Sequence, residues 1–377
     1  MASGAGATTA APPVLWGLTR RDVILLGAAL VSSAAAGALS IFGVRPVVTF
    51  AASTVALAIL AAIVSRAVEQ VGARLSPGAT GVLQASLSNI PEFFVSIFAL
   101  RAGLMKVVQS ALIGSILANL LLVLGLAILA GGIRNGVQRF SSRAPRMIAT
   151  LLLLAIGALA IPTIANEIHT PASRHTDALD IACTIILLVL FVASIPFFVH
   201  SGRTPDGDPG DECGKMTHDP ESTSEWSLML AVVVLAFGGA GAAFVSEWFV
   251  DALRPTVAVL GLSEAFTGLV IVAVAGNAIE NVVGIRLAVH GKPEYAMSVI
   301  LNSSLQVAIG LVPILVLVSY FLGGAVLTLV VPPLLIVALA LAALLVAFIV
   351  FDGESMWLEG AALIGLYGIV AAAFWWG

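Results

Sequence analysis

The sequence predicts an all-α, polytopic membrane protein with about 11 transmembrane helices. Of its 377 residues, 60% are hydrophobic and only 10% are charged, and the mean hydropathy is +1.09. Soluble domains carry about 25% charged residues, and a soluble fold cannot hide this much apolar surface. Apolar runs of the length that crosses a bilayer, about 20 residues, recur along the chain. An Asn-x-x-Glu motif occurs twice within these runs.

The predicted elements follow one another with short connections. Residues 1–21 form a tail rich in Ala, Gly and Thr, which we expect to be disordered. The tail ends at Arg20 and Arg21, and the run 22–41 fits an uncleaved leading helix better than a cleaved signal. The remaining spans are expected at 46–68, 77–100, 105–131, 147–165, 178–200, 226–250, 262–289, 294–320, 325–350 and 355–376.

A polar segment, residues 201–225, divides the apolar part of the chain. It carries seven acidic residues and three prolines, and we expect a solvated linker on the cytosolic side. The sequence therefore predicts a first repeat of five helices over 42–200 and a second over 226–377. Because five is odd, the second repeat enters the membrane from the opposite face, which is the inverted-repeat plan of many transporters.

The two halves also match in register. Asn89 and Glu92 recur as Asn277 and Glu280, and both pairs are offset by 188 residues (277 − 89 and 280 − 92). At the same offset, further matches are Gly103 with Gly291, Ser110 with Ser298, and Ser115 with Ser303.

The distribution of basic residues predicts the orientation. Of the 17 Lys and Arg residues, twelve fall on the side that holds the N-terminus and five on the other. The excess of Lys and Arg marks the cytoplasmic side. We therefore expect a cytoplasmic N-terminus and, with an odd number of spans, a C-terminus on the opposite side.

Two acidic residues lie deep inside predicted spans. Charged groups within the membrane are costly and usually functional, and Glu92 and Glu280 occupy matched positions of the two halves. A purely structural carboxyl pair is the alternative, and the matched positions argue against it. Asn89 and Asn277 stand three residues earlier, so on a helix each would share a face with its Glu.

Backbone oxygens and further polar side chains complete the expected site. Pro91 has no N–H, so it would leave the Leu87 carbonyl without a helical partner, and Gly276 offers matching flexibility. Ca²⁺ takes 6–8 oxygen ligands. The serines of the following spans have an alternative role in helix packing. The expected metal-binding residues are Glu92, Glu280, Asn89, Asn277, Ser88, Gly276, Leu87, Gln109, Ser303, Ser304 and Gln306.

The carboxylate pair also predicts proton coupling, through Glu92 and Glu280. Two carboxylates close together in a low dielectric resist double ionisation, so a divalent cation and protons compete for the same oxygens. We therefore expect an antiporter with Ca²⁺ and H⁺ as transported ions. No catalytic residue, cofactor or nucleic-acid partner is expected, because the chain lacks a His-Glu-x-x-His motif or a similar constellation. The lipid bilayer is the expected partner, and a homo-oligomer is compatible with the sequence. A channel is disfavoured, because its filter is usually built by several chains.

At these residues the chain resembles the calcium/cation antiporter superfamily, and most of all its calcium/proton exchanger branch. The similarity runs from about residue 46 to the C-terminus. The stretches that carry it are Phe98-Ala99-Leu100-Arg101-Ala102-Gly103, Gly114-Ser115-Ile116-Leu117-Ala118-Asn119-Leu120, Gly261-Leu262-Ser263-Glu264-Ala265-Phe266 and Asp352-Gly353-Glu354-Ser355-Met356-Trp357-Leu358-Glu359-Gly360.

The resemblance implies alternating-access exchange, with Asn89, Glu92, Asn277 and Glu280 as the ion-binding core. It also implies supporting positions at Gln109 and in the stretch from Ser303 to Gln306. Three residues depart from the family motifs: Ser88 replaces Gly, Pro91 replaces Thr and Asn281 replaces His. The Pro-Glu pair is similar to the sodium/calcium branch, so a sodium/calcium or other cation exchanger of the same architecture remains the alternative.

Overall fold

The computed structural model describes residues 17–72, 74, 87, 89–200, 226–276, 278–324 and 326–375, without the side chains of 197–200 and 278–281. Across these ranges, nine helices are long and apolar enough to cross a membrane. They are α1 (Arg20–Ile41), α2 (Pro46–Gly72), α5–η1–α6 (Met105–Asn135), α7 (Arg143–Glu167), η2–α8 (Pro171–Pro196), α9 (Leu228–Leu260), α13–η5–α14 (Pro293–Ser319), α15 (Pro333–Phe351) and α16 (Trp357–Trp375).

Two further predicted spans correspond to shorter helical pieces. The run 77–100 contains α4 (Ile90–Arg101), and most of its first half lies outside the described residues. The run 262–289 contains α10 (Glu264–Phe266), η4 (Thr267–Val272), α11 (Ala273–Gly276) and α12 (Ala278–Val289). The all-α, polytopic membrane fold is therefore confirmed. The count of eleven spans stays a prediction.

Three of the long spans contain short pieces of different helical winding. The first divides into α5 (Met105–Leu117), a π-helical η1 (Ala118–Val123) and α6 (Leu124–Asn135). Another divides into α13 (Pro293–Gln306), a π-helical η5 (Val307–Leu311) and α14 (Val312–Ser319). The third joins a 3₁₀ turn, η2 (Pro171–His175), to α8 (Thr176–His200).

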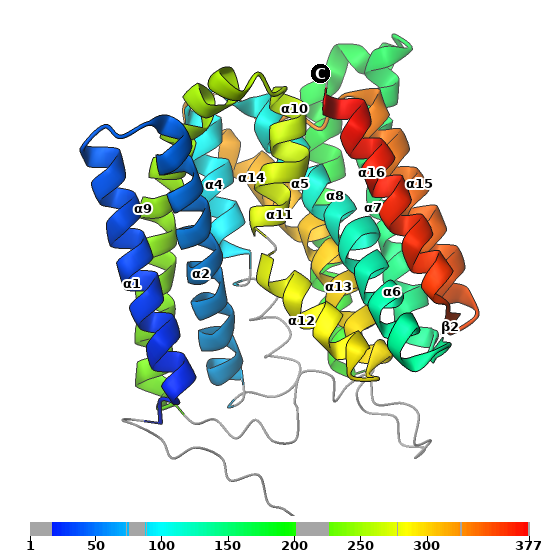
Figure 1. Cartoon of the computed structure of the whole chain (residues 1–377). Coiled ribbons are helices and arrows are strands. Elements are labelled where there is room, and N and C mark those ends of the chain that lie inside the picture. Colours follow the sequence, from blue (N-terminus) through cyan, green and yellow to red (C-terminus); the bar gives the residue numbers. More distant parts are fainter. Residues whose placement is uncertain are drawn as a thin grey trace, which may run out of the picture.

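The helices stand side by side in one bundle. Figure 1 shows α1, α2 and α9 on one side, α6, α7, α8, α15 and α16 on the other, and α4, α5 and α11–α13 between them. Helix α1 begins at the lower end of the view, and the C-terminus lies at the upper end. This agrees with an odd number of crossings.

The helix bounds recur at the predicted offset. Helices α4 and α12 begin and end 188 residues apart (278 − 90 and 289 − 101), and α5 and α13 begin at the same offset (293 − 105). The turns between these pairs contain Gly103 and Gly291, with φ of 75° and 74°. In Figure 1, α4 rises from the middle of the bundle whereas α12 descends from it. These features support the inverted repeat, which itself stays a prediction.

Glycines allow the central helices to approach closely. A Cβ atom added at Gly268 would lie 2.5 Å from the Val107 carbonyl oxygen, and one at Gly114 would lie 2.5 Å from the Leu269 Cα. Small residues at such contacts are the usual means by which membrane helices pack backbone to backbone. The crossing of α5 and η4 therefore requires both glycines.

The predicted span 325–350 begins too early. Helix α15 starts at Pro333, and residues 326–332 are non-helical. The consecutive prolines Pro332 and Pro333 explain this, because a residue before proline is disfavoured in the α region. The predicted span 226–250 is too short, since α9 continues to Leu260 and ends where Gly261 adopts φ 64°.

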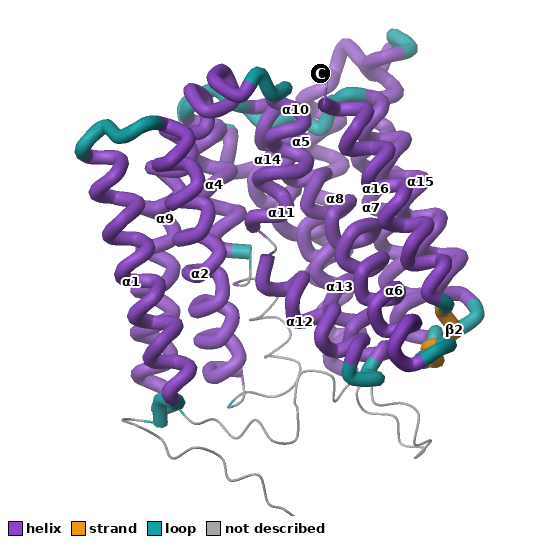
Figure 2. Tube along the Cα trace, viewed as in Figure 1, coloured by secondary structure: helices purple, strands orange, loops and turns teal. Residues whose placement is uncertain are grey.

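A two-stranded ribbon at the lower end was not predicted (Figure 2). Strand β1 (Gln138–Arg139) pairs antiparallel with β2 (Glu354–Ser355), and Arg139 forms an exposed ion pair of 3.0 Å with Glu354. β1 follows α6, and β2 joins α15 to α16. The motif 352–360 carried part of the resemblance. It covers the connection between α15 and α16, including strand β2, and the first turn of α16.

The leading helix is anchored at its first turn. Thr19 and Asp22 form a capping box at the start of α1. The buried Asp22 carboxylate also accepts a hydrogen bond of 3.0 Å from the Trp226 indole and lies 3.4 Å from the Arg66 guanidinium. Trp226 is the first described residue after the linker, so this cluster joins α1, α2 and the start of α9.

Candidate ion-binding site

A cavity of about 40 Å³ lies between helices of both halves of the chain. One water needs roughly 10–15 Å³ measured in this way, so the space admits an ion or several waters. Its walls come from α2, α4, α5, α9, η4, α11 and η5, and the residues are Leu57, Pro91, Glu92, Val95, Ser96, Ala111, Leu112, Ser115, Phe249, Val272, Ala273, Ala275, Gly276 and Leu311.

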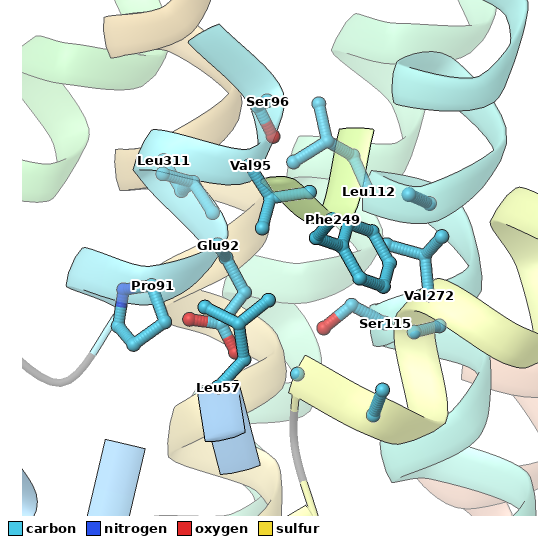
Figure 3. A pocket seen from close by; sticks show the side chains of 14 residues that line it. Leu57, Pro91, Glu92, Val95, Ser96, Leu112, Ser115, Phe249, Val272 and Leu311 are labelled. Carbon is cyan, nitrogen blue, oxygen red and sulfur yellow. The ribbon is translucent and has the colours of Figure 1, made fainter. Parts of the chain in front are cut away.

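Glu92 supplies the acidic group of this cavity (Figure 3). It lies in the first turn of α4, which begins in the middle of the bundle. Helix N-termini carry a partial positive charge that favours an anion. The local fold therefore places a carboxylate where its charge is stabilised, although most of the lining is apolar.

Helix α4 begins one residue before Pro91. Because α4 begins at Ile90, Pro91 occupies the first turn, where a missing N–H breaks no hydrogen bond. Asn89 is the N-cap, with φ −92° and ψ 18°, and its carbonyl accepts from the Phe93 N–H at 3.0 Å. Leu87 and Asn89 therefore precede α4, and Glu92 is its third residue. The shared role of Asn89 and Glu92 in ion binding stays a prediction.

Glu92 meets the second half of the chain at Gly276. A Cβ atom at Gly276 would lie 2.8 Å from Glu92 Oε1 and 3.2 Å from its Cγ. Gly276 ends α11, immediately before the second Asn-x-x-Glu motif. The first acidic residue of the predicted pair thus touches the backbone that leads into the second.

Part of the predicted site lies outside the described residues. Asn277 and Ser88 are not described, and neither is the side chain of Glu280. The backbone of Glu280 lies in the first turn of α12, as Glu92 lies in the first turn of α4. Within the described residues, no group of three His, Cys, Asp or Glu side chains could hold a metal. The pairing of the two carboxylates therefore stays a prediction.

Two serines line the cavity beside Glu92. Ser115 of α5 was singled out as a repeat match, and Figure 3 shows its side chain pointing into the same space as Glu92. Ser96 of α4 was missed. Its spacing could have revealed it, because a residue four positions after Glu92 lies on the same helix face.

The other predicted ligands lie apart from this cavity. The Ser303 hydroxyl accepts a hydrogen bond of 3.2 Å from the Asn119 amide, which links α13 to η1. Ser304 donates to the Ile300 carbonyl of its own helix, and Gln306 is buried at the end of α13. Gln109 donates to the carbonyls of Thr328 and Val330, each at 2.9 Å. Metal ligation by these four residues stays a prediction that the described geometry does not support.

The fold and the cavity define a class of protein. Interrupted helices whose ends meet in the middle of a multi-pass bundle are typical of secondary transporters. Residues 45–199 and 230–376 match the sodium/calcium exchanger protein family. This chain belongs to that family, whose members are transporters and not catalytic enzymes.

Individual relatives refine the assignment. The chain is 33% identical over 340 residues to a Ca²⁺/H⁺ antiporter of Synechocystis, covering 86% of this chain and 90% of the relative. It is 34% identical over 331 residues to the Ca²⁺/H⁺ antiporter ChaA of Bacillus subtilis, covering 87% and 92%. The structure of native YfkE matches with a TM-score of 0.75 at 32% identity, covering 92% of this chain and 99% of YfkE. These relatives support the calcium/proton exchanger branch.

More distant structures share the fold. The H⁺/Ca²⁺ exchanger CAX matches with a TM-score of 0.72 at 15% identity, covering 94% of this chain and 92% of that one. At this identity the likeness concerns the fold alone.

Proposed function

We propose that this protein exchanges Ca²⁺ for protons across a membrane by alternating access. The observation that carries the proposal is the position of Glu92, a carboxylate in a mid-bundle cavity against the backbone that leads to Glu280. The relatives named Ca²⁺/H⁺ antiporter support the choice of ions.

The exchange follows from electrostatics. Ca²⁺ would bind between Glu92 and Glu280, with oxygen from Ser115, Asn89, Asn277 and backbone carbonyls completing its shell. Without the cation, two facing carboxylates repel one another, and protons neutralise them. Because Ca²⁺ and protons occupy the same oxygens, each displaces the other. Antiport results if only a neutralised site changes its access from one side to the other.

The orientation belongs to the same proposal. With the N-terminus and the linker 201–225 in the cytoplasm, an inward proton gradient would drive Ca²⁺ out of the cytoplasm. Lower pH should weaken Ca²⁺ binding, because protonation of either carboxyl removes a negative charge from the site.

Sodium/calcium exchange is the second candidate. The family description and the pair Pro91-Glu92, similar to the sodium/calcium branch, favour it. Ca²⁺ flux driven by a sodium gradient at equal pH on both sides would support sodium as the counter-ion. Flux that needs a pH gradient and ignores sodium would support protons.

The test is Ca²⁺ uptake into proteoliposomes with a preset pH gradient. We expect Glu92→Gln and Glu280→Gln each to lower uptake by about tenfold or more, because each removes one of two charges that offset the cation. Glu167→Gln, at the exposed end of α7, is the matched control and should transport normally. Normal uptake by either site variant would refute the two-carboxylate site.

A further inference from the structure

A buried extended segment lies beside the candidate site and is held by side chains of four helices. The Leu327 N–H donates to Ser319 of α14 at 2.9 Å, and Gln109 of α5 donates to two carbonyls of the segment. Thr163 of α7 accepts from the Val331 N–H and donates to the Leu329 carbonyl, both at 3.1 Å.

The fourth helix, α8, contributes a buried carboxylate. Asp180 is 1% exposed, and its Oδ2 accepts from the Leu329 N–H at 3.1 Å. Its Oδ1 has no hydrogen-bond partner among the described residues, and neither has the hydroxyl of Thr184, one helical turn further along α8. A buried polar atom without a hydrogen-bond partner is destabilising. A proton on Oδ1 would neutralise the group and leave the bond to Leu329 intact.

The surroundings of Asp180 contain no cationic partner in the described part of the chain. Asp177 and Cys183 are its titratable neighbours on α8, and Tyr320, just after α14, faces both aspartates. Within the described residues, Asp180 takes part in no ion pair.

A second cavity adjoins the same segment. It measures about 20 Å³, enough for one water by the criterion used above. Its lining residues include Gln109, Thr328 and Leu329, the residue that Asp180 holds. Leu112 lines both this cavity and the one that contains Glu92. The Leu112 side chain therefore borders both cavities.

We propose that Asp180 binds a proton and passes it, through a water in the second cavity, past Leu112 toward the Glu92 cavity. Asp180 lies in the second turn of α8, and α8 begins at the upper end of the bundle (Figure 1). The proton comes from water at that end, rests on Oδ1 and leaves to the water held beside Gln109 and Thr328. Protons thus reach the first cavity by a route separate from that of the cation. The inference rests on the proposed exchange of cation and protons.

Asp180→Asn tests the proton-binding step, because an asparagine oxygen still accepts from the Leu329 N–H. We expect infrared spectra, recorded across a pH titration, to show a protonated-carboxyl band that Asp180→Asn lacks. We also expect the variant to need a several-fold higher proton concentration for half-maximal exchange. The proposal would be overturned if Asp180→Asn showed the same infrared titration as the wild-type protein. An unchanged proton concentration for half-maximal exchange would also overturn it.

Leu112 and its neighbour Ile113 provide a matched pair for the route. Both are 5% exposed, but Ile113 lines only the second cavity. We expect Leu112→Ala to join the cavities and to raise the proton leak of proteoliposomes without Ca²⁺ several-fold, whereas Ile113→Ala should not. Equal leaks in the two variants would contradict the route.

Calorimetry separates this inference from the proposed function. Ca²⁺ binding at fixed pH should be lost in Glu92→Gln and retained in Asp180→Asn. Loss in both would refute a separate role for Asp180. Retention of Ca²⁺ binding in Glu92→Gln would refute the proposed ion site. The infrared titration would still decide whether Asp180 binds a proton.

Discussion

Glu92 Oε1 of α4 lies so close to Gly276 of α11 that a Cβ atom on the glycine would stand 2.8 Å from it. The two residues belong to different halves of the chain, and they meet in the wall of the central cavity. The carboxylate takes this position because the facing residue has no side chain.

Gly276→Ala should therefore displace the carboxylate. The clashing atoms belong to the flexible end of the Glu92 side chain, so the carboxylate itself would shift, and every 1.4 kcal/mol of lost ion contact lowers affinity about tenfold. We expect Ca²⁺ binding, measured by calorimetry, to weaken roughly tenfold. Gly157→Ala in α7 is the control, because its Cβ would meet nothing within 4 Å. Equal affinities in the two variants would show that the contact does not position Glu92.

Gly360→Ala should loosen the packing of α16 against α6. The added Cβ would lie 2.5 Å from the Gly125 carbonyl oxygen and 2.5 Å from the Leu129 nitrogen, which are backbone atoms that cannot swing away. We expect the free energy of unfolding in detergent to fall by about 1–3 kcal/mol. Gly365→Ala in the same helix meets nothing within 4 Å and should not destabilise the protein. A similar loss in both variants would contradict the contact.

Ser303→Ala should cost more stability than Ser304→Ala. The first removes the acceptor of the buried Asn119 amide, whereas the second removes only a bond within α13. An unsatisfied buried donor costs about 1–3 kcal/mol. Thermal unfolding would measure the difference, and Asn119→Leu should reduce the cost of Ser303→Ala. Equal losses from the two serine variants would argue against the link between the halves.

Trp226→Phe should weaken the anchor of the leading helix. It removes the indole N–H that donates to Asp22 and keeps most of the buried ring. Hydrogen bonds to charged groups contribute about 1.5–3 kcal/mol. We expect a lower unfolding temperature, and non-additive losses when Trp226→Phe is combined with Asp22→Asn. Trp357→Phe, at a residue that is 52% exposed, is the control. Additive losses would show that Trp226 and Asp22 act independently.

Most of the fold could be predicted because a chain that crosses lipid must satisfy its backbone hydrogen bonds within each segment, which favours long apolar helices. The run 105–131, for example, appears as a span in both sequence and structure. The segment 326–332 could not be predicted. Its residues are mostly apolar, as in a membrane-spanning helix. Its backbone partners, Gln109, Thr163 and Asp180, come from distant parts of the chain.

The candidate site could be predicted only in part, for the same reason. The repeated motif drew attention to Glu92, and a membrane position makes a carboxylate conspicuous. The helix start at Ile90 could not be predicted, and it makes Asn89 an N-cap and puts Pro91 in the first turn of α4. Gln109 matched a family position, yet its amide is engaged by the extended segment.

The ribbon of β1 and β2 has a consequence for motion. It fastens the connection between α6 and α7 to the connection between α15 and α16, so these four helices are tethered at one end and cannot separate there without breaking the ladder. Helices α1, α2 and α9 are free of this tether. If exchange proceeds by the proposed alternating access, we expect these three helices to move relative to the four tethered ones.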